Sequence, residues 1–168
     1  YRDTATVVKG GRRPHPFAPG RIGSSLRLGG PKTRIYAQIS SGLELPTAEF
    51  TIMAWISAQT LPRNAVLVSD MNLAGEEVFR FGLVGDHGHL GLALAEGNRV
   101  LQVVDSSPLP LEEWTHVSVV KTTEALRLYR NGALISSEPL DGFQAQPHRP
   151  FSIGGIPKES DAKKRTQR

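Results

Sequence analysis

The sequence predicts an all-β domain, an antiparallel two-sheet sandwich of the jelly-roll type. Apolar and polar residues alternate in about eleven short runs, the pattern of strands with one buried face. The 17 glycines and 12 prolines are spread along the chain as turn residues between these runs. No segment of about 11 residues or more sustains the 3.6-residue period of a helix. Strands of this kind bury their apolar faces most simply as two packed sheets.

The first strands are predicted from residues 1–58. Residues 1–22 are rich in proline, glycine and arginine and form an entry segment with at most one strand, near "TATVV". "SSLRLGG" and "RIYAQI" alternate on either side of a glycine- and proline-containing turn, so we expect a hairpin. "EFTIMAWISA" is apolar on both faces, because Met53 and Trp55 alternate with a row of apolar residues. This strand is therefore predicted to be central and covered on both sides.

The middle of the chain predicts a meander of hairpins. The runs "AVLVSD", "EVFRFGLV", "HLGLALAE" and "RVLQVVD" follow one another, separated by "MNLAGE", "GDHG" and "GN". "WTHVSVVKT", "ALRLYR" and "ALISS" come next, and Asn131-Gly132 between the last two is the strongest short hairpin signal in the chain. "PFSIGG" predicts one more short strand. Residues 157–168 are a basic polar tail with no apolar face.

The order of these strands resembles the laminin-G-like jelly rolls of the concanavalin A-like lectin and glucanase superfamily. The resemblance spans roughly residues 22–155, and the domain is placed at residues 23–156. Its most specific part combines a Trp-x-His-Val strand with an aromatic-x-Asn-Gly turn, carried here by Trp114, His116, Val117, Tyr129, Asn131 and Gly132. "GRIGSSLRLGG" is similar to the first core strand of the family. The resemblance implies that Trp114 fills the edge of the core and that His116 hydrogen-bonds locally.

The sequence departs from the family pattern in two places. The family continues after the Ile-Gly-Gly strand into an apolar strand, whereas "KESDAKKRTQR" stands here. An edge left in this way should be covered by residues 1–10 or by a second copy of the chain. Many relatives carry an aspartate near a calcium position after the first core strand, where this chain has Pro31, Lys32, Thr33 and Arg34. We therefore expect no cofactor and no metal, with calcium kept as an alternative because loop oxygens are available.

Composition excludes several classes of function. The net charge of +4 depends largely on "GGRR" and "KKRTQR", so we expect no nucleic-acid partner. The absence of cysteine excludes disulfides and thiolate zinc sites. No apolar run approaches the roughly 18 residues of a membrane helix, so no direct membrane insertion is expected. Because the chain opens with Tyr1, we expect it to be part of a larger protein.

Hydrolysis of sugars by this superfamily requires two carboxylates on one face of a strand. The nearest match places Glu159 and Asp161 with Lys164 in the polar tail, and lysine cannot serve as the acid. We therefore expect no enzyme activity. An enzyme would instead need a carboxylate pair across a cleft from the remaining candidates, which are Glu44, Glu49, Asp70, Glu76, Glu77 and Asp86.

Two loops carry the candidate ligand-binding residues. Asp70 and Asn72 belong to an acidic cluster in "SDMNLAGEE", for which a solvated hairpin loop is the simpler interpretation. Asp86, His87 and His89 lie in "GDHGHLG", where two histidines two residues apart could contact a metal, but no third ligand is identifiable. An exposed turn is the simpler interpretation there.

Two functions follow from these observations. The first is a non-catalytic binding or adhesion module of a larger extracytoplasmic protein, secreted, periplasmic or at the cell surface, with a glycan or protein ligand bound through loops at the rim of the sandwich. The alternative is a structural accessory domain with no ligand of its own, which contacts neighbouring domains of the parent chain and braces an enzyme or a membrane-anchored regulator. A fold alone does not decide between them.

Overall fold

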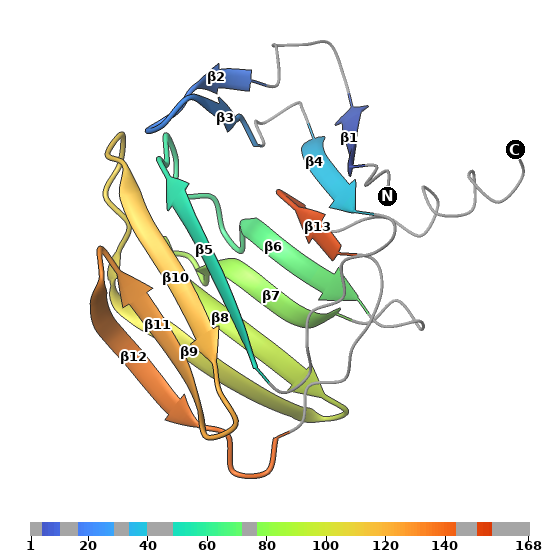
Figure 1. Cartoon of the computed structure of the whole chain (residues 1–168), viewed down its shortest axis with the longest axis vertical. Coiled ribbons are helices and arrows are strands. Elements are labelled where there is room, and N and C mark those ends of the chain that lie inside the picture. Colours follow the sequence, from blue (N-terminus) through green and yellow to red (C-terminus); the bar gives the residue numbers. More distant parts are fainter. Residues whose placement is uncertain are drawn as a thin grey trace, which may run out of the picture.

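A computed structural model describes residues 5–10, 17–28, 34–39, 49–71, 77–143 and 151–155 of the 168-residue chain. These residues form thirteen strands and no helix, which confirms the predicted all-β sandwich. Two antiparallel sheets pack face to face, and a two-stranded hairpin lies beside them (Figure 1). Within the described residues, no helix is long and apolar enough to cross a membrane.

The larger sheet has seven strands in the order β1-β4-β13-β6-β7-β8-β9. Their bounds are Ala5–Gly10 for β1, Arg34–Ile39 for β4, Phe151–Ile153 for β13, Val66–Met71 for β6, Glu77–Val84 for β7, His89–Glu96 for β8 and Arg99–Pro108 for β9. The strands from β6 to β9 form the predicted meander, because each pairs antiparallel with the next along the chain.

The smaller sheet has four strands in the order β12-β11-β10-β5. Their bounds are Ala133–Pro139 for β12, Ala125–Arg130 for β11, Thr115–Lys121 for β10 and Phe50–Ile56 for β5. The turn between β11 and β12 is Asn131-Gly132, with φ of 49° and 82°, as the Asn-Gly signal predicted. β9 packs against β11 and β12, so the two sheets meet along this side of the sandwich.

The core lies between the two sheets. Along the strands whose side chains are described, alternate residues point inward. The side chains with little or no exposure come mainly from β7, β8, β10 and β11: Phe79, Phe81, Leu83, Leu90, Leu92, Leu94, Val117, Val119, Leu126 and Leu128. Lys121 ends β10 on the same inner face. Burial lowers the pKa of Lys121 below its usual 10.5, and the nearby charge of Glu49 offsets part of this effect.

Three predictions about the first strands need correction. Residues 1–22 hold two strands instead of at most one, because β2 (Phe17–Pro19) pairs with β3 (Ser24–Leu26). The expected hairpin between "SSLRLGG" and "RIYAQI" does not form. β3 belongs to the small hairpin, whereas β4 pairs with β1 and β13. β1 thus pairs with β4 and occupies the edge of the sheet. This is one of the two arrangements predicted for the edge, the other being a second copy of the chain.

The third correction concerns "EFTIMAWISA", which was expected to be a central strand covered on both sides. Within the described part of the chain, β5 is instead the last strand of the four-stranded sheet, paired with β10 alone. Its inner residues are half-buried and its outer residues are exposed. Apolar residues on both faces do not require two covered faces, because Met53 and Trp55 are exposed on the outer face.

Candidate functional site

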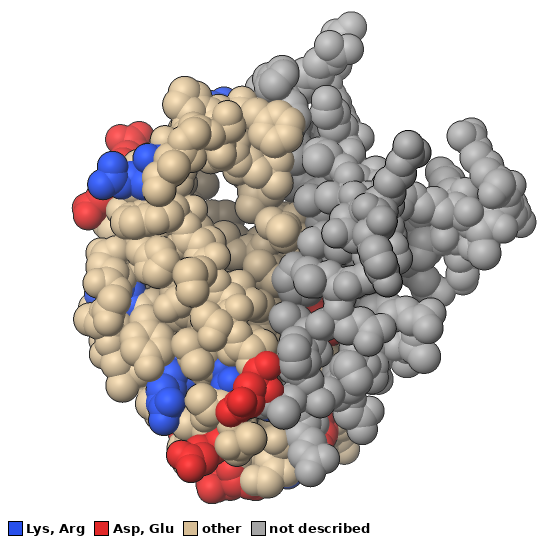
Figure 2. All heavy atoms as spheres, in the orientation of Figure 1, with Lys and Arg blue, Asp and Glu red and all other residues tan. Residues whose placement is uncertain are grey.

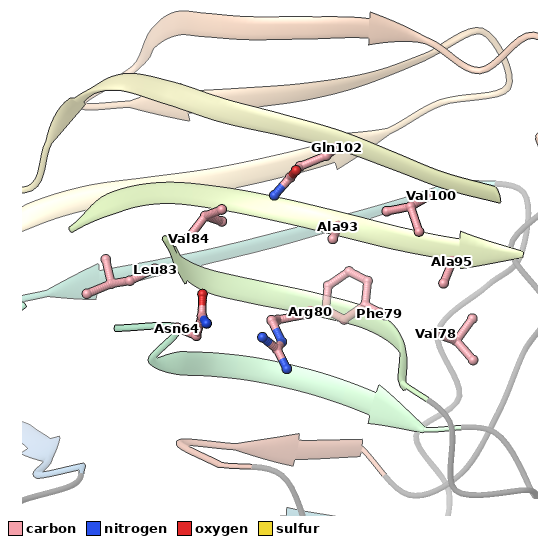
Figure 3. A pocket seen from close by; sticks show the side chains of 10 residues that line it. All are labelled: Asn64, Val78, Phe79, Arg80, Leu83, Val84, Ala93, Ala95, Val100 and Gln102. Atoms are coloured by element: carbon pink, nitrogen blue, oxygen red, sulfur yellow. The ribbon is translucent and has the colours of Figure 1, made fainter. Parts of the chain in front are cut away.

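The outer face of the seven-stranded sheet carries a shallow pocket over β7, β8 and β9. Its volume is about 270 Å³. The register places Arg80 of β7 opposite Ala93 of β8, and Ala93 opposite Gln102 of β9. In the adjacent row, Ala95 lies opposite Val100. The alanines therefore form a low floor between longer side chains, as Figure 3 shows for Ala93 between Arg80 and Gln102.

The pocket belongs to a row of residues that crosses the whole seven-stranded sheet. From Arg80 the register continues to Ser69 on β6 and to Ser152 on β13. It then continues at the backbone level to Gln38 on β4 and Thr6 on β1. The Ser69 and Ser152 hydroxyls are 2.7 Å apart, and both donate to the carbonyl of Gly155. Six strand spacings make this row about 29 Å long.

The pocket ends at a rim formed by two connected loops. Asn64, in the β5–β6 connection, accepts a hydrogen bond of 3.0 Å from the backbone N–H of Gly85 in the β7–β8 turn. Arg63 and Asp86 form an exposed ion pair of 2.7 Å between the same loops. The carbonyl of Ala65 accepts from the N–H of Leu83 at 2.7 Å, and a Cβ at the preceding Gly82 would lie 2.1 Å from that carbonyl oxygen. The close approach of these loops therefore requires glycine at position 82.

An ion pair joins the two sheets at this end of the sandwich. Asp105 of β9 is 2 % exposed, and its carboxylate lies 2.9 Å from Nη1 of Arg130 on β11. The other oxygen of the Asp105 carboxylate accepts a hydrogen bond of 2.9 Å from the N–H of Ser107. Nδ1 of His89 lies 2.8 Å from the carbonyl oxygen of Asp105. These contacts fix the end of β9. Asp105, Arg130 and His89 therefore have structural roles.

The structure brings together only some of the predicted site residues. Asp86, His87 and His89 lie in or beside the β7–β8 turn, and the two histidine rings are 6.2 Å apart between centroids. Asp70 was expected in a solvated loop, but it is buried in β6 and pairs with Phe79, five residues before the end of β7. This separates Asp70 from the turn by about 17 Å along the strands. Asn72 lies outside the described residues.

A metal centre does not emerge from these residues. In the described ranges, no group of three or more His, Cys, Asp or Glu side chains is arranged to hold an ion. Asp86 is paired with Arg63, and His89 contacts the Asp105 carbonyl. Calcium binding therefore stays a prediction that these residues do not support.

The Trp-x-His strand has a structural place in the sheet. Trp114 is half-buried just before β10, and the backbone N–H of His116 donates to the Asn131 side chain at 2.9 Å. The N–H of Asn131 donates in return to the His116 carbonyl at 2.8 Å. The His116 ring packs against the edge of Trp55, with 5.2 Å between centroids. These contacts link the Trp-x-His strand of the family motif to the Asn-Gly turn that ends the motif.

Sequence reasoning missed the pocket residues. Arg80, Gln102 and Asn64 belong to no recognised motif, and they meet only through strand pairing and loop contacts. One signal was present in "HLGLALAE", where leucine alternates with glycine and alanine. The leucines face the core, so the small residues face outward, where Ala93 and Ala95 are half-buried and Gly91 is covered by its neighbours.

Comparison with known proteins identifies the family. Residues 31–164 match a laminin-G family model described as the concanavalin A-like lectin/glucanases superfamily. The chain belongs to this superfamily. Since the superfamily contains both lectins and glucanases, membership alone does not distinguish binding from hydrolysis. No curated protein sequence matches the chain at a significant level.

Solved structures share the fold of this superfamily member at low sequence identity. Domain 4 of AbnA, a GH43 extracellular arabinanase from Geobacillus stearothermophilus solved with arabinotriose, has a TM-score of 0.70 and 16% identity, over 89% of this chain and 72% of that one. The receptor-binding domain of botulinum neurotoxin D has a TM-score of 0.55 and 15% identity, over 92% and 40%. Domains LG4-5 of the mouse laminin α1 chain have a TM-score of 0.53 and 17% identity, over 70% and 32%.

Proposed function

We propose that this chain is a non-catalytic carbohydrate-binding module that takes its ligand on the outer face of the seven-stranded sheet. The observation that carries the proposal is the pocket over β7, β8 and β9. Its floor is apolar and low at Ala93 and Ala95, and planar hydrogen-bonding side chains stand around it at Asn64, Arg80 and Gln102. A sugar ring has an apolar face and a rim of hydroxyls, so it matches an apolar floor with a few polar groups around it.

The size of the pocket suits a short ligand unit. Its volume is that of a small group such as one sugar unit. Beyond Arg80 the row continues into Ser69 and Ser152, whose side chains are fully buried, so the proposed contact is confined to the surface over β7, β8 and β9. The side chains that line the pocket include no carboxylate. Binding without hydrolysis is the chemistry that this lining favours, because glycoside hydrolysis uses a carboxylate pair.

The cellular location and the domain context of this binding role are proposed from a similar solved structure. The most similar domain named above belongs to an extracellular arabinanase and was solved with arabinotriose. We infer an extracytoplasmic location and a place beside other domains of a larger protein, with glycan as the ligand in preference to protein. The alternative role, an accessory domain that braces a neighbour, is favoured by the β2–β3 hairpin, whose Ile22 is strongly exposed.

Calorimetric titration with arabinotriose and with a panel of neutral and acidic oligosaccharides tests the proposal. We expect binding by at least one oligosaccharide and at least tenfold weaker binding by Ala93→Phe, because a phenyl ring would fill the floor of the pocket. Ala133→Phe is the matched control, since Ala133 is exposed on β12 of the other sheet. Arg80→Gln should also weaken binding by removing a charged donor.

Two results would contradict this function. A panel without a single ligand would favour the accessory-domain alternative. Unchanged binding by Ala93→Phe would place the ligand elsewhere on the molecule, at the loops of the rim or on the four-stranded sheet.

A further inference from the structure

The polar side chains that line the pocket over β7, β8 and β9 are rich in hydrogen-bond donors. Among the described residues of the lining, Arg80 is the one charged side chain, and Asn64 and Gln102 are the two amides. A guanidinium carries five N–H donors and no acceptor, whereas an amide carries an NH2 donor and an oxygen acceptor. The orientation of the amides therefore determines whether the pocket can accept hydrogen bonds from a ligand as well as donate them.

The amide of Asn64 is oriented by the backbone of the β7–β8 turn. The N–H of Gly85 donates to Oδ1 of Asn64 at 3.0 Å. Because a backbone N–H can only donate, the atom that faces the turn is the oxygen, and the NH2 group is left for other partners. Figure 3 shows Asn64 on the same side of Ala93 as Arg80, with Gln102 on the other side. The side of the pocket with Arg80 therefore presents donors to a ligand.

A ligand unit with a negative charge satisfies these donors better than a neutral one. A sugar hydroxyl has a proton to donate as well as lone pairs, whereas an ionised carboxylate only accepts. The described lining of the pocket contains no carboxylate that would compete for the same donors. Arg80 also interacts with other groups of the protein, and its five donors allow it to bind ligand oxygens in addition. The pocket therefore favours an anionic group at Arg80.

The register leaves room for one sugar ring between Arg80 and Gln102. The two residues flank Ala93 on neighbouring strands, so their Cα atoms are two strand spacings apart, about 10 Å. The short side chain of Ala93 keeps the floor low, and the volume of about 270 Å³ suits one ring. Arg80 is half-buried, and opposite charges attract more strongly beside apolar groups than in open water. An ion pair with Arg80 should therefore contribute to affinity.

The described charges near the pocket also suit an anion. Asp86 follows Gly85 in the β7–β8 turn, and its carboxylate is paired with Arg63 at 2.7 Å. The net charge of +4 on the whole chain favours the approach of anions. The face that carries the four-stranded sheet is less suited, because its charged side chains gather toward its ends (Figure 2). The pocket instead places a cation beside an apolar floor.

We propose that the pocket binds an acidic sugar unit, with the oxygens of a carboxylate or a sulfate ester on the Arg80 guanidinium. The planar fork of a guanidinium can donate two parallel hydrogen bonds to such a group, and charge-assisted hydrogen bonds are stronger than neutral ones. The NH2 group of Asn64 donates from the same side, and Gln102 contacts ring hydroxyls from the other. This inference rests on the proposed function, because it names the class of glycan for the same site.

Calorimetric titration of the full chain with matched pairs of sugars tests the charge. The probes are the trimers of galacturonate, mannuronate and guluronate, each paired with its methyl ester, and a sulfated galactotriose paired with galactotriose. We expect at least one acid to bind at least tenfold more tightly than its neutral partner, because the pair differs in the anionic group. Preference for a uronate identifies the carboxylate as the recognised group, and preference confined to the sulfated sugar identifies the sulfate ester.

Variants of Arg80 test the place of the anion. Arg80→Gln should lower the affinity for the acid at least tenfold and that for the neutral partner by less than about threefold. Arg80→Lys keeps the charge without the planar fork and should give an intermediate affinity for the acid. Arg127→Gln is the matched control, because it removes the same charge from β11 of the other sheet and should change neither affinity. Thermal unfolding shows whether each variant is folded.

The outcomes separate this inference from the proposed function. Equal affinities within every pair, or binding of arabinotriose without binding of any acid, would overturn the inference and leave the proposed function in place. Equal losses in Arg80→Gln and Arg127→Gln would also overturn it, since the preference for acids would then reflect the net charge of the chain. A chain that binds none of the sugars would contradict the proposed function and this inference together.

Discussion

At the scale of single residues, the end of the sandwich depends on one buried charge and its partner. Asp105 lies between the sheets, and Arg130 reaches it from the opposite sheet. A buried carboxylate is stable only when a counter-charge and hydrogen-bond donors compensate for lost water. Ser107 supplies one such donor. Removing the Arg130 guanidinium would leave the Asp105 carboxylate buried without a counter-charge.

We therefore expect Arg130→Met to reduce the free energy of unfolding by about 3 to 5 kcal/mol. Arg63→Met is the control, because the ion pair of Arg63 with Asp86 is exposed and should contribute no more than about 1 kcal/mol. Urea unfolding followed by tryptophan fluorescence measures both. Equal losses in the two variants would show that burial does not distinguish these ion pairs.

At the scale of elements, the hairpin from β11 to β12 is the feature that the sequence defined best. Both turn residues have positive φ, which asparagine tolerates and glycine adopts freely. Asn131 also connects this turn to β10 through two hydrogen bonds with the backbone of His116. The turn thus holds three strands of the four-stranded sheet.

Gly132→Ala should cost about 1 kcal/mol or more, because φ of 82° is unfavourable for a residue with a Cβ. Asn131→Ala should cost a similar amount or more, since the acceptor for His116 is lost as well. Thermal unfolding of both variants checks this expectation. Ala133→Gly, one residue into the exposed start of β12, is a control that should change stability less than either.

Element positions followed from local patterns, and element partners did not. The strands from β6 to β12 were predicted because each has its own alternation and an adjacent turn signal. β2 was missed because three residues, the last of them Pro19, give no period. The hairpin from β3 to β4 was wrong because Gly29, Gly30 and Pro31 resemble a tight turn, although the strands on either side belong to different sheets.

At the scale of the whole molecule, strand pairing determines the proposed site as well as the fold. Arg80, Ala93 and Gln102 are neighbours because three strands share one register. Ser69 and Ser152, 83 residues apart in the chain, join them through β13. No local pattern contains such a row, so the sequence could indicate the family and the outer face of β8 but not the pocket. The predicted ligand residues share polar side chains in segments that resemble loops, and this pattern does not reveal that Asp70 is buried in β6.

The pairing of β1 with β4 gives a prediction about the complete sheet. Deletion of residues 1–10 removes the strand that covers the edge of β4. Amide hydrogens of residues 34–39 should then exchange at least tenfold faster, because local opening of an edge strand requires less free energy. Deletion of residues 157–168 is the control. Hydrogen exchange by mass spectrometry distinguishes the two, and equal effects would mean that the tail also contributes to this edge.

The place of β13 also affects how the chain can fold during synthesis. β13 is made after every other described strand, yet it lies between β4 and β6, which are made much earlier. Until residues 151–153 arrive, the seven-stranded sheet consists of two separate parts, β1 with β4 and the meander from β6 to β9. Non-local pairings of this kind slow folding and expose strand edges on the nascent chain. The meander from β6 to β9 can therefore fold before residues 151–153 are made, whereas the row of paired residues across the sheet is complete only when β13 joins β4 and β6.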